Sequence, residues 1–199
     1  MKQQIVLIPG GNAFRKYEDY IKDLEDTKLS LSFFDKKDWK TELGNILGEE
    51  YQMITPQMPN RFNARYKEWE IWFDKIADLL EDEVILIGTS LGGIFLAKYL
   101  AENTFSKKLK ALFLVAAPYN TDPEGDLCDF VTDEDLSNIE KQTKHIFIYQ
   151  SKNDEIVPFE DCQKYKKLLP EATLRVFENY GHFKLAEFPE IVEDIRALR

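Results

Sequence analysis

Uninterrupted apolar runs, separated by longer helical stretches, constrain the fold of this chain more than any other feature of its sequence. Val84–Ile87 and Ala111–Val115 are apolar at every position instead of at alternate positions. Such runs are typical of strands that are buried on both faces, as in parallel sheets covered by helices. The pattern predicts six strands, at Ile5–Ile8, Tyr51–Thr55, Glu83–Gly88, Leu109–Ala116, His145–Gln150 and Thr173–Glu178.

The connections between these strands are long enough for crossover helices. Glu68–Leu80 places six apolar side chains on one expected helical stripe: Trp69, Trp72, Phe73, Ile76, Leu79 and Leu80. Further helices are expected at Leu91–Ala101, Phe159–Leu169 and Phe188–Leu198. Strands that alternate with helices form right-handed βαβ units, so the chain is predicted to be a three-layer α/β/α sandwich with a mostly parallel sheet.

The chain has 199 residues, a length that suits one domain, and residues 1–199 are predicted to form a single unit. Residues 12–48 form a long connection in which two helices are expected, at Tyr17–Asp26 and Asp38–Leu47. The stretch between them, Thr27–Lys37, is either part of a decorated crossover or a segment that passes near the functional site. Residues 118–140 are expected to form a short flap-like insertion.

Composition excludes several classes of protein. There are 36 acidic and 26 basic side chains, a net charge of −10, which argues against binding to nucleic acid phosphates. No apolar run approaches the roughly 18–20 residues needed to cross a bilayer. The first run, Ile5–Ile8, is too short for a secretory signal, so a cytoplasmic protein is expected. Cys128 and Cys162 have neither disulfide-framework nor metal-ligand spacing.

Ser90 lies in the sequence Gly88-Thr89-Ser90-Leu91-Gly92, which fits the G-x-S-x-G pattern of a nucleophile turn. A buried strand enters the pattern and a helix leaves it, which is the context that the chemistry requires. The serine must adopt a strained backbone conformation, and glycine is needed two residues away on each side, where the backbones approach closely. Ser90 is therefore the predicted nucleophile.

A serine nucleophile needs a base, and the chain contains only two histidines. His145 opens a strand and is expected at the opposite edge of the sheet. His182 follows the last strand, so it is expected at the same carboxyl edge as Ser90.

The acid that orients this base should follow a strand at the same edge, between the serine and the histidine in the chain. Asp154, after the strand His145–Gln150, fits best. The alternatives are the adjacent Glu155 and the aspartates that follow the preceding strand, Asp122, Asp126 and Asp129.

An oxyanion hole needs two hydrogen-bond donors. The backbone N–H of Leu91, directly after the nucleophile, is the first candidate. The second is expected in the turn Pro9-Gly10-Gly11-Asn12, where the N–H of Gly11 is preferred and that of Asn12 is the alternative. A phosphate-binding loop is disfavoured, because the turn lacks both G-x-G-x-x-G and a Walker lysine.

Four stretches together resemble a known group, the small α/β-hydrolases of the RBBP9/YdeN-type serine hydrolase family. They are Ile8–Asn12, Met58-Pro59-Asn60 followed by Trp69, Gly88–Gly93, and Asn153–Pro158 with Gly181-His182-Phe183. The resemblance implies an α/β-hydrolase fold, an intracellular enzyme without a large lid, and the hydrolysis of simple esters or of small amide or amino-acid ester bonds. It places the catalytic triad on Ser90, Asp154 and His182. The 12–48 connection is longer than the family pattern, so the resemblance does not define the shape and selectivity of the pocket.

The sequence therefore predicts a serine hydrolase, with a carboxylesterase acting on small esters as the preferred activity. The alternatives are a peptidase or amidase, a thioesterase, or a non-catalytic member of the fold that binds a partner. No metal or organic cofactor is implied. A small-molecule ester or amide is the expected substrate, nucleic acid and membrane are not expected as partners, and nothing in the sequence indicates a protein partner.

Overall fold

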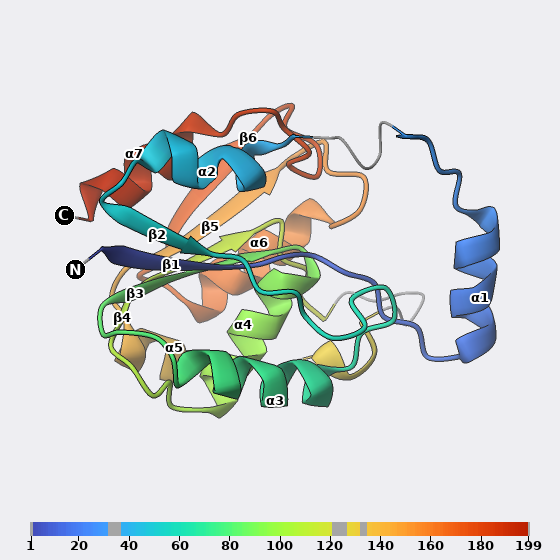
Figure 1. The fold of residues 1–199 in the computed structure, drawn as a ribbon, viewed down its shortest axis with the longest axis horizontal. Coiled ribbons are helices and arrows are strands. Elements are labelled where there is room, and N and C mark those ends of the chain that lie inside the picture. Colours follow the sequence, from blue (N-terminus) through green and yellow to red (C-terminus); the bar gives the residue numbers. More distant parts are fainter. Residues whose placement is uncertain (1, 32–36, 121–126, 132–134, 199) are drawn as a thin grey trace.

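Six parallel strands form one sheet in the computed structural model, which describes residues 2–31, 37–120, 127–131 and 135–198. The spatial order is β2-β1-β3-β4-β5-β6, and every neighbouring pair is parallel (Figure 1). The predicted strands are confirmed, with ends that shift by up to two residues. Their bounds are β1 (Gln3–Ile8), β2 (Tyr51–Ile54), β3 (Val84–Thr89), β4 (Leu109–Val115), β5 (Ile146–Ser151) and β6 (Thr173–Phe177).

Helices cover both faces of the sheet, which confirms the three-layer sandwich (Figure 1). One face carries α2 (Trp39–Leu47) and α7 (Pro189–Ala197). The other carries α3 (Tyr66–Ala77), α4 (Leu91–Glu102), α5 (Ser137–Gln142) and α6 (Phe159–Leu168).

Strand β1 shows why the apolar runs are continuous. Ile5 and Leu7 point into the core under α2 and α7, whereas Val6 and Ile8 point into the core on the opposite face. Successive strand side chains alternate between faces, so a strand buried on both sides needs an apolar residue at every position.

Helix α3 differs from the prediction in its ends and in its apolar stripe. It begins at Tyr66 and ends at Ala77, and its buried face carries Trp69 and Phe73. Trp72 is 43% exposed and Leu79 is 81% exposed. Successive residues project about 100° apart around a helix, so Trp72 points well away from Phe73. Leu79 lies beyond the end of the helix. The prediction that these two side chains belong to the buried stripe was wrong.

Both helices of the 12–48 connection form where they were predicted, but they lie in different surroundings. Helix α2 packs on the sheet through Trp39, Leu43 and Leu47. Helix α1 (Tyr17–Asp26) stands beyond the carboxyl ends of the strands and has no buried residue (Figure 1). Of the stretch Thr27–Lys37, residues 32–36 lie outside the described residues, so its relation to the site stays a prediction.

The described part of the 118–140 segment contains a short 3-10 helix, η2 (Cys128–Phe130), and α5. Lys98 on α4 holds η2 in place, since its Nζ donates to the carbonyls of Asp129 and Val131 at 2.8 and 2.9 Å. Residues 121–126 and 132–134 lie outside the described residues, so the predicted flap is only partly described. Within the described ranges, no helix is both long and apolar enough to span a bilayer.

Candidate active site

Ser90 forms the sharp turn between β3 and α4. Its backbone has φ 52° and ψ −123°, a region that residues with side chains rarely occupy. Its N–H donates to the carbonyl of Val115 on β4 at 2.9 Å. Strain of this kind persists only where the surrounding structure holds it, and it is concentrated at functional sites.

Two glycines make this turn sterically feasible. A Cβ added to Gly88 would lie 2.4 Å from the carbonyl oxygen of Gly92. A Cβ added to Gly92 would lie 2.3 Å from the carbonyl oxygen of Ile8 on the neighbouring strand. Both contacts are with backbone, which moves only if the turn moves. The glycine requirement inferred from the motif is met at both positions.

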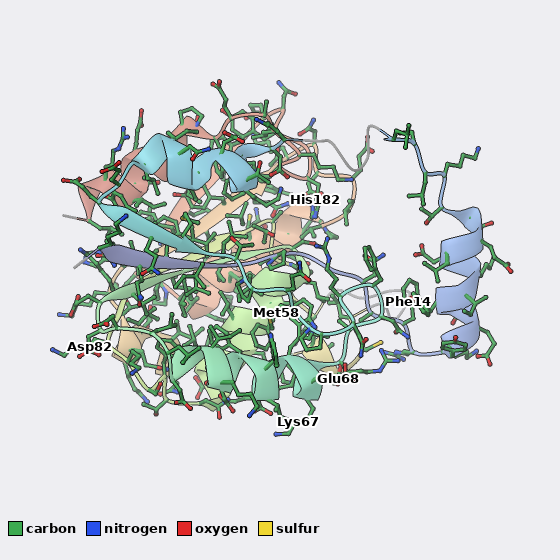
Figure 2. The ribbon with its side chains drawn as sticks, viewed as in Figure 1. Phe14, Met58, Lys67, Glu68, Asp82 and His182 are labelled. Carbon is green, nitrogen blue, oxygen red and sulfur yellow. The ribbon has the colours of Figure 1, made fainter. Side chains whose placement is uncertain are left out.

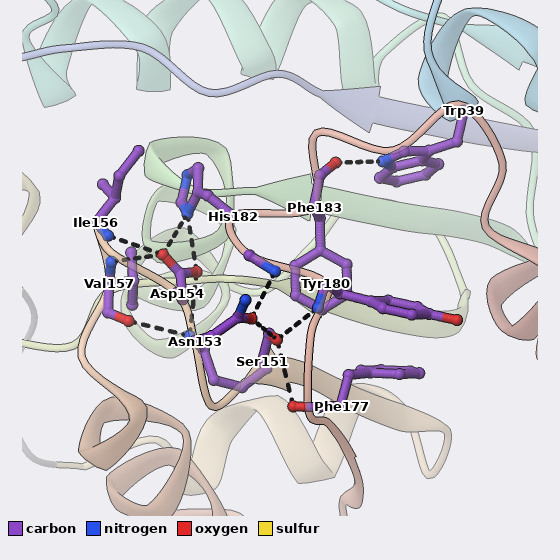
Figure 3. A network of polar contacts seen from close by, with 12 residues as sticks. Trp39, Ser151, Asn153, Asp154, Ile156, Val157, Phe177, Tyr180, His182 and Phe183 are labelled. Atoms are coloured by element: carbon purple, nitrogen blue, oxygen red, sulfur yellow. Dashed lines mark hydrogen bonds and ion pairs between the residues drawn. The ribbon is translucent and has the colours of Figure 1, made fainter.

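Asp154 and His182 meet at the same edge of the sheet (Figure 3). His182 Nδ1 lies 2.9 Å from Oδ2 and 3.1 Å from Oδ1 of Asp154. Both side chains are largely withdrawn from solvent, since 14% of the His182 side chain and none of the Asp154 side chain is exposed. An ionised carboxylate only accepts hydrogen bonds, so the pairing places a proton on Nδ1 and leaves Nε2 available for another partner.

Backbone donors complete the surroundings of the Asp154 carboxylate. The N–H groups of Ile156 and Val157 donate to its Oδ1 at 2.9 and 3.0 Å. Burial acts to raise the pKa of Asp154, but the hydrogen bonds from His182 and from these two N–H groups outweigh it and hold that pKa below its usual value. Asp154 is therefore ionised at neutral pH, as an orienting carboxylate should be.

Two residues that the sequence analysis did not single out hold the His182 loop. Ser151 Oγ accepts a hydrogen bond from the N–H of Tyr180 at 2.9 Å and donates to Asn153 Oδ1 at 2.7 Å. The same Asn153 oxygen accepts from the N–H of Gly181 at 2.8 Å (Figure 3). Ser151 ends β5, and Asn153 follows it in the loop that carries Asp154. Their proximity to Asp154, and for Asn153 its place in one of the stretches that resemble the family, were the signals in the sequence.

Helix α2 holds the other side of the same loop. The indole Nε1 of Trp39 donates to the carbonyl of Phe183 at 3.0 Å (Figure 3). The backbone N–H of Trp39 donates to the carbonyl of Leu185 at 3.1 Å. Trp39 is 144 residues away from Phe183 in the chain, so no local pattern in the sequence indicates this contact.

The turn after β1 borders the nucleophile. A Cβ added to Gly10 would lie 3.1 Å from Ser90 Cβ. The N–H of Asn12 already donates to the carbonyl of Arg61 at 2.9 Å, which favours Gly11 over Asn12 as the donor of this turn. Leu91 is the first residue of α4, so its N–H has no acceptor within the helix.

The alternative site residues lie elsewhere or outside the described residues. His145 is exposed at the start of β5, the opposite edge of the sheet from Ser90. Glu155 is exposed, and Asp129 Oδ2 accepts from the N–H of Tyr66 at 3.0 Å. Asp122 and Asp126 lie outside the described residues.

The structure thus places Ser90 at the edge that holds the Asp154–His182 pair. Among the hydrogen bonds of the described residues there is none between Ser90 and His182. Hydrogen bonds of this kind commonly tighten only in the complex with substrate. The described residues also contain no group of three or more His, Cys, Asp or Glu side chains arranged to hold a metal ion.

Comparison with known proteins decides the family. A family model described as serine hydrolase matches residues 34–194, which is most of the chain. The chain belongs to the serine hydrolase family. Two curated relatives are each 26% identical to this serine hydrolase. The hydrolase YdeN of Bacillus subtilis matches over 69% of this chain and 73% of its own length. The serine hydrolase RBBP9 of Rattus norvegicus matches over 74% and 78%.

Solved structures confirm the α/β-hydrolase fold of this serine hydrolase. The crystal structure of the ydeN gene product from B. subtilis has a TM-score of 0.71 at 19% identity and covers 99% of this chain and 98% of that chain. The meta-cleavage product hydrolase CumD has a TM-score of 0.67 at 15% identity, with 99% and 92% covered. The predicted resemblance to the RBBP9/YdeN-type family is confirmed.

One of the quoted motifs also has a structural basis. Trp69 on α3 is fully buried, and its indole Nε1 donates to the carbonyl of Pro59 at 2.8 Å. Asn60 adopts a positive φ of 46°, and its side chain donates to Glu68 at 2.9 Å. The Pro-Asn and Trp elements of the motif therefore hold the same crossover in place beside the turn after β1.

Proposed function

We propose that this serine hydrolase is a carboxylesterase that acts on small esters through an acyl-enzyme formed on Ser90. Its triad is Ser90, Asp154 and His182. The oxyanion donors are the N–H groups of Leu91 and Gly11. The observation that carries the proposal is the Asp154–His182 pair, placed by separate loops at the edge where the strained Ser90 lies.

In the first half of the reaction, Ser90 Oγ attacks the ester carbonyl carbon while His182 Nε2 takes the hydroxyl proton. Asp154 keeps the other proton on Nδ1 and stabilises the imidazolium that forms. The negative charge that develops on the carbonyl oxygen is met by the two backbone N–H groups. The C–O bond of the ester then breaks, and His182 gives its proton to the departing alcohol.

In the second half, water attacks the acyl carbon of the Ser90 ester while His182 takes a proton from it. Collapse of the tetrahedral intermediate breaks the bond to Ser90 Oγ, which recovers its proton from His182. The carboxylic acid leaves and the enzyme is regenerated. The helix dipole of α4, whose N-terminus follows Ser90 directly, favours the oxyanion in both halves.

A fluorophosphonate probe and p-nitrophenyl acetate test the nucleophile. Ser90→Ala should abolish labelling and reduce kcat by on the order of 10⁴-fold or more, since triad members act as a unit. The matched control is Ser106→Ala, an exposed serine before β4 at the opposite edge of the sheet, which should label and turn over like the native chain. Labelling of the Ser90→Ala variant at the native level would show that the nucleophile is another residue.

A second measurement tests the substrate class. Oxygen esters, thioesters and amides of the same acyl group, compared by kcat/KM, separate an esterase from a thioesterase and from a peptidase or amidase. We expect the oxygen ester to be preferred. A higher kcat/KM for the thioester or the amide would overturn the esterase proposal while leaving the triad in place.

A further inference from the structure

A cavity of about 420 Å³ lies between α1 and the crossover that precedes α3. Its aromatic side chains are Tyr17 and Tyr20 from α1 and Phe62 from the crossover. Its volume lies within the range of small-molecule sites, which is about 300–1,000 Å³. No residue of the proposed triad lines this cavity, and of the residues in the sequence motifs only Asn60 does. The proposed reaction therefore gives the cavity no role.

Two of the three aromatic side chains of this cavity are largely exposed. Tyr17 is 63% exposed and Phe62 is 53% exposed. The Tyr20 ring contacts those of Phe14 and Tyr17, with centroids 5.7 and 5.9 Å apart, so three rings form one cluster at the start of α1. A helix of this length that buries no residue gains little stability from its own propensity. A ligand covered by these rings would supply the apolar contact that α1 lacks.

Polar side chains of the cavity hold one another in fixed positions. Asn60 donates to Glu68 at 2.9 Å, and Arg65 donates to Asn63 Oδ1 at 3.0 Å. Figure 2 shows Glu68 at the start of α3 and Phe14 on the side of the molecule that carries α1. A ring that enters the cavity therefore has both aromatic side chains and ordered hydrogen-bonding groups around it.

Two backbone hydrogen bonds tie the crossover that lines the cavity to the turn beside Ser90. The Asn12 N–H donates to the carbonyl of Arg61 at 2.9 Å, and the Asn12 carbonyl accepts from Ala64 at 2.8 Å. Asn12 belongs to the turn whose Gly10 borders Ser90. The crossover that lines the cavity is thus the immediate neighbour of the turn beside Ser90.

We propose that this cavity is the subsite that binds an aromatic ring carried by the ester substrate. The proposal rests on the proposed function, which supplies the ester hydrolysis at Ser90, and adds that the preferred esters carry an aromatic ring. Aromatic rings favour one another in edge-to-face and offset arrangements by more than the area they bury, which an aliphatic ring of similar size does not reproduce. The polar groups of the cavity suit a ring that carries a hydrogen-bonding substituent.

A kinetic comparison of two rings tests the subsite. The substrates are p-nitrophenyl esters of ω-phenylalkanoic acids, from phenylacetate to 6-phenylhexanoate. Each is compared with the p-nitrophenyl ester of the ω-cyclohexylalkanoic acid of the same chain length. At the chain length that reaches the cavity, we expect kcat/KM to favour phenyl by about two- to twelvefold, the worth of one aromatic pair. The preference should fall toward one in Tyr20→Leu and Phe62→Leu. Leu24→Ala, on the same helix and outside the cavity, should keep it.

An equilibrium measurement keeps the subsite separate from the reaction. Binding of 2-naphthol is measured by calorimetry on the native chain and the same variants, with circular dichroism to verify folding. Weaker binding of 2-naphthol to Tyr20→Leu and Phe62→Leu than to Leu24→Ala supports the subsite. If the same protein hydrolyses no ester, the proposed function fails and the subsite stands. Ester hydrolysis with no phenyl preference and equal 2-naphthol binding by all variants would overturn the subsite and leave the proposed function standing.

Discussion

At the scale of single residues, the Asp154 carboxylate accepts hydrogen bonds from several groups of its surroundings. Its oxygens accept from His182 Nδ1, from two backbone N–H groups and from Gln150, whose Nε2 lies 3.2 Å from Oδ2. Each of these hydrogen bonds favours the ionised form. The same set of contacts fixes the orientation of the His182 ring.

Replacing this carboxylate by an amide should remove the orientation while keeping the shape. In Asp154→Asn, the amide can donate to His182 Nδ1 and so stabilise the wrong tautomer. We expect kcat for p-nitrophenyl acetate to fall by on the order of 10⁴-fold at pH 7. Glu155→Gln, an exposed neighbour, is the control and should keep native kcat. An Asp154→Asn variant that kept a tenth of the native kcat would argue against Asp154 as the orienting acid.

The lowered pKa of Asp154 predicts a pH-dependent contribution to stability. The folded pKa lies below that of the unfolded chain, so the folded state favours the ionised carboxylate. That contribution is fully present above the unfolded pKa, about 3.9, and is lost as the pH falls through the folded value. In urea denaturation, the difference in free energy of unfolding between the native chain and Asp154→Asn should therefore shrink from pH 5 to pH 3. An unchanged difference over this interval would contradict the prediction.

At the scale of secondary-structure elements, α2 belongs to the 12–48 connection and contacts the loop that carries the proposed catalytic base. Trp39 is buried, and its ring packs edge-to-face on Phe188 with centroids 5.2 Å apart. Its two hydrogen bonds go to the segment that follows His182. The helix therefore sets the position of that loop relative to the sheet.

Trp39→Phe removes the indole donor and leaves the carbonyl of Phe183 without this partner. Losing a hydrogen bond to a buried group costs about 1–3 kcal/mol, which urea denaturation would measure. We also expect a several-fold fall in kcat with little change in KM, because His182 is less well placed while the substrate pocket is intact. Trp72→Phe, at an exposed position of α3, should change neither quantity. A destabilised Trp39→Phe variant with native kcat would limit Trp39 to a role in folding.

How far the sequence predicts these elements depends on the kind of contact involved. Continuous apolar runs predicted β1, β3, β4 and β5, because burial on both faces leaves a local signature. The edge strands β2 and β6 carry polar residues and are partly exposed, so they lack this signature. The G-x-S-x-G pattern predicted the Ser90 turn, because the steric need for Gly88 and Gly92 is also local. The placement of Asp154 beside His182 followed from the rule that loops after parallel strands share an edge.

Other features have no local signature. The period of a helix fixes the angles between its side chains, but not which side chains face the sheet or where the helix ends. The assignment of Trp72 and Leu79 to the buried stripe of α3 was therefore wrong. The hydrogen bonds of Ser151 and Asn153 to the His182 loop link segments about 28 residues apart, and that of Trp39 spans 144 residues. Such pairs become visible only once the fold places them.

At the scale of the whole molecule, helix α1 stands apart from the packed α/β/α sandwich. Two apolar cores lie on either side of the sheet, and α1 belongs to neither. Local opening costs least where few contacts are buried, so the segment around α1 is expected to be the first to open in the described part of the chain.

Limited proteolysis with trypsin tests this expectation. Lys16, Lys22 and Lys28 are exposed around α1, and we expect the first cut at one of them, with mass spectrometry to identify the site. The cut chain should keep its far-UV circular dichroism, because the sandwich does not depend on α1. A first cut within α3 or α4 would contradict the prediction.

The separateness of α1 has a consequence for how this protein could change over generations. Most random substitutions lower the free energy of unfolding. Substitutions in a helix that packs against no core residue lower it little. The aromatic positions of α1 are therefore free to vary under selection for a new substrate, while Ser90, Asp154 and His182 lie on turns and loops at the carboxyl edge of the packed sheet. The proposed catalytic residues therefore lie in the packed part of the molecule, and the positions most free to vary lie in α1.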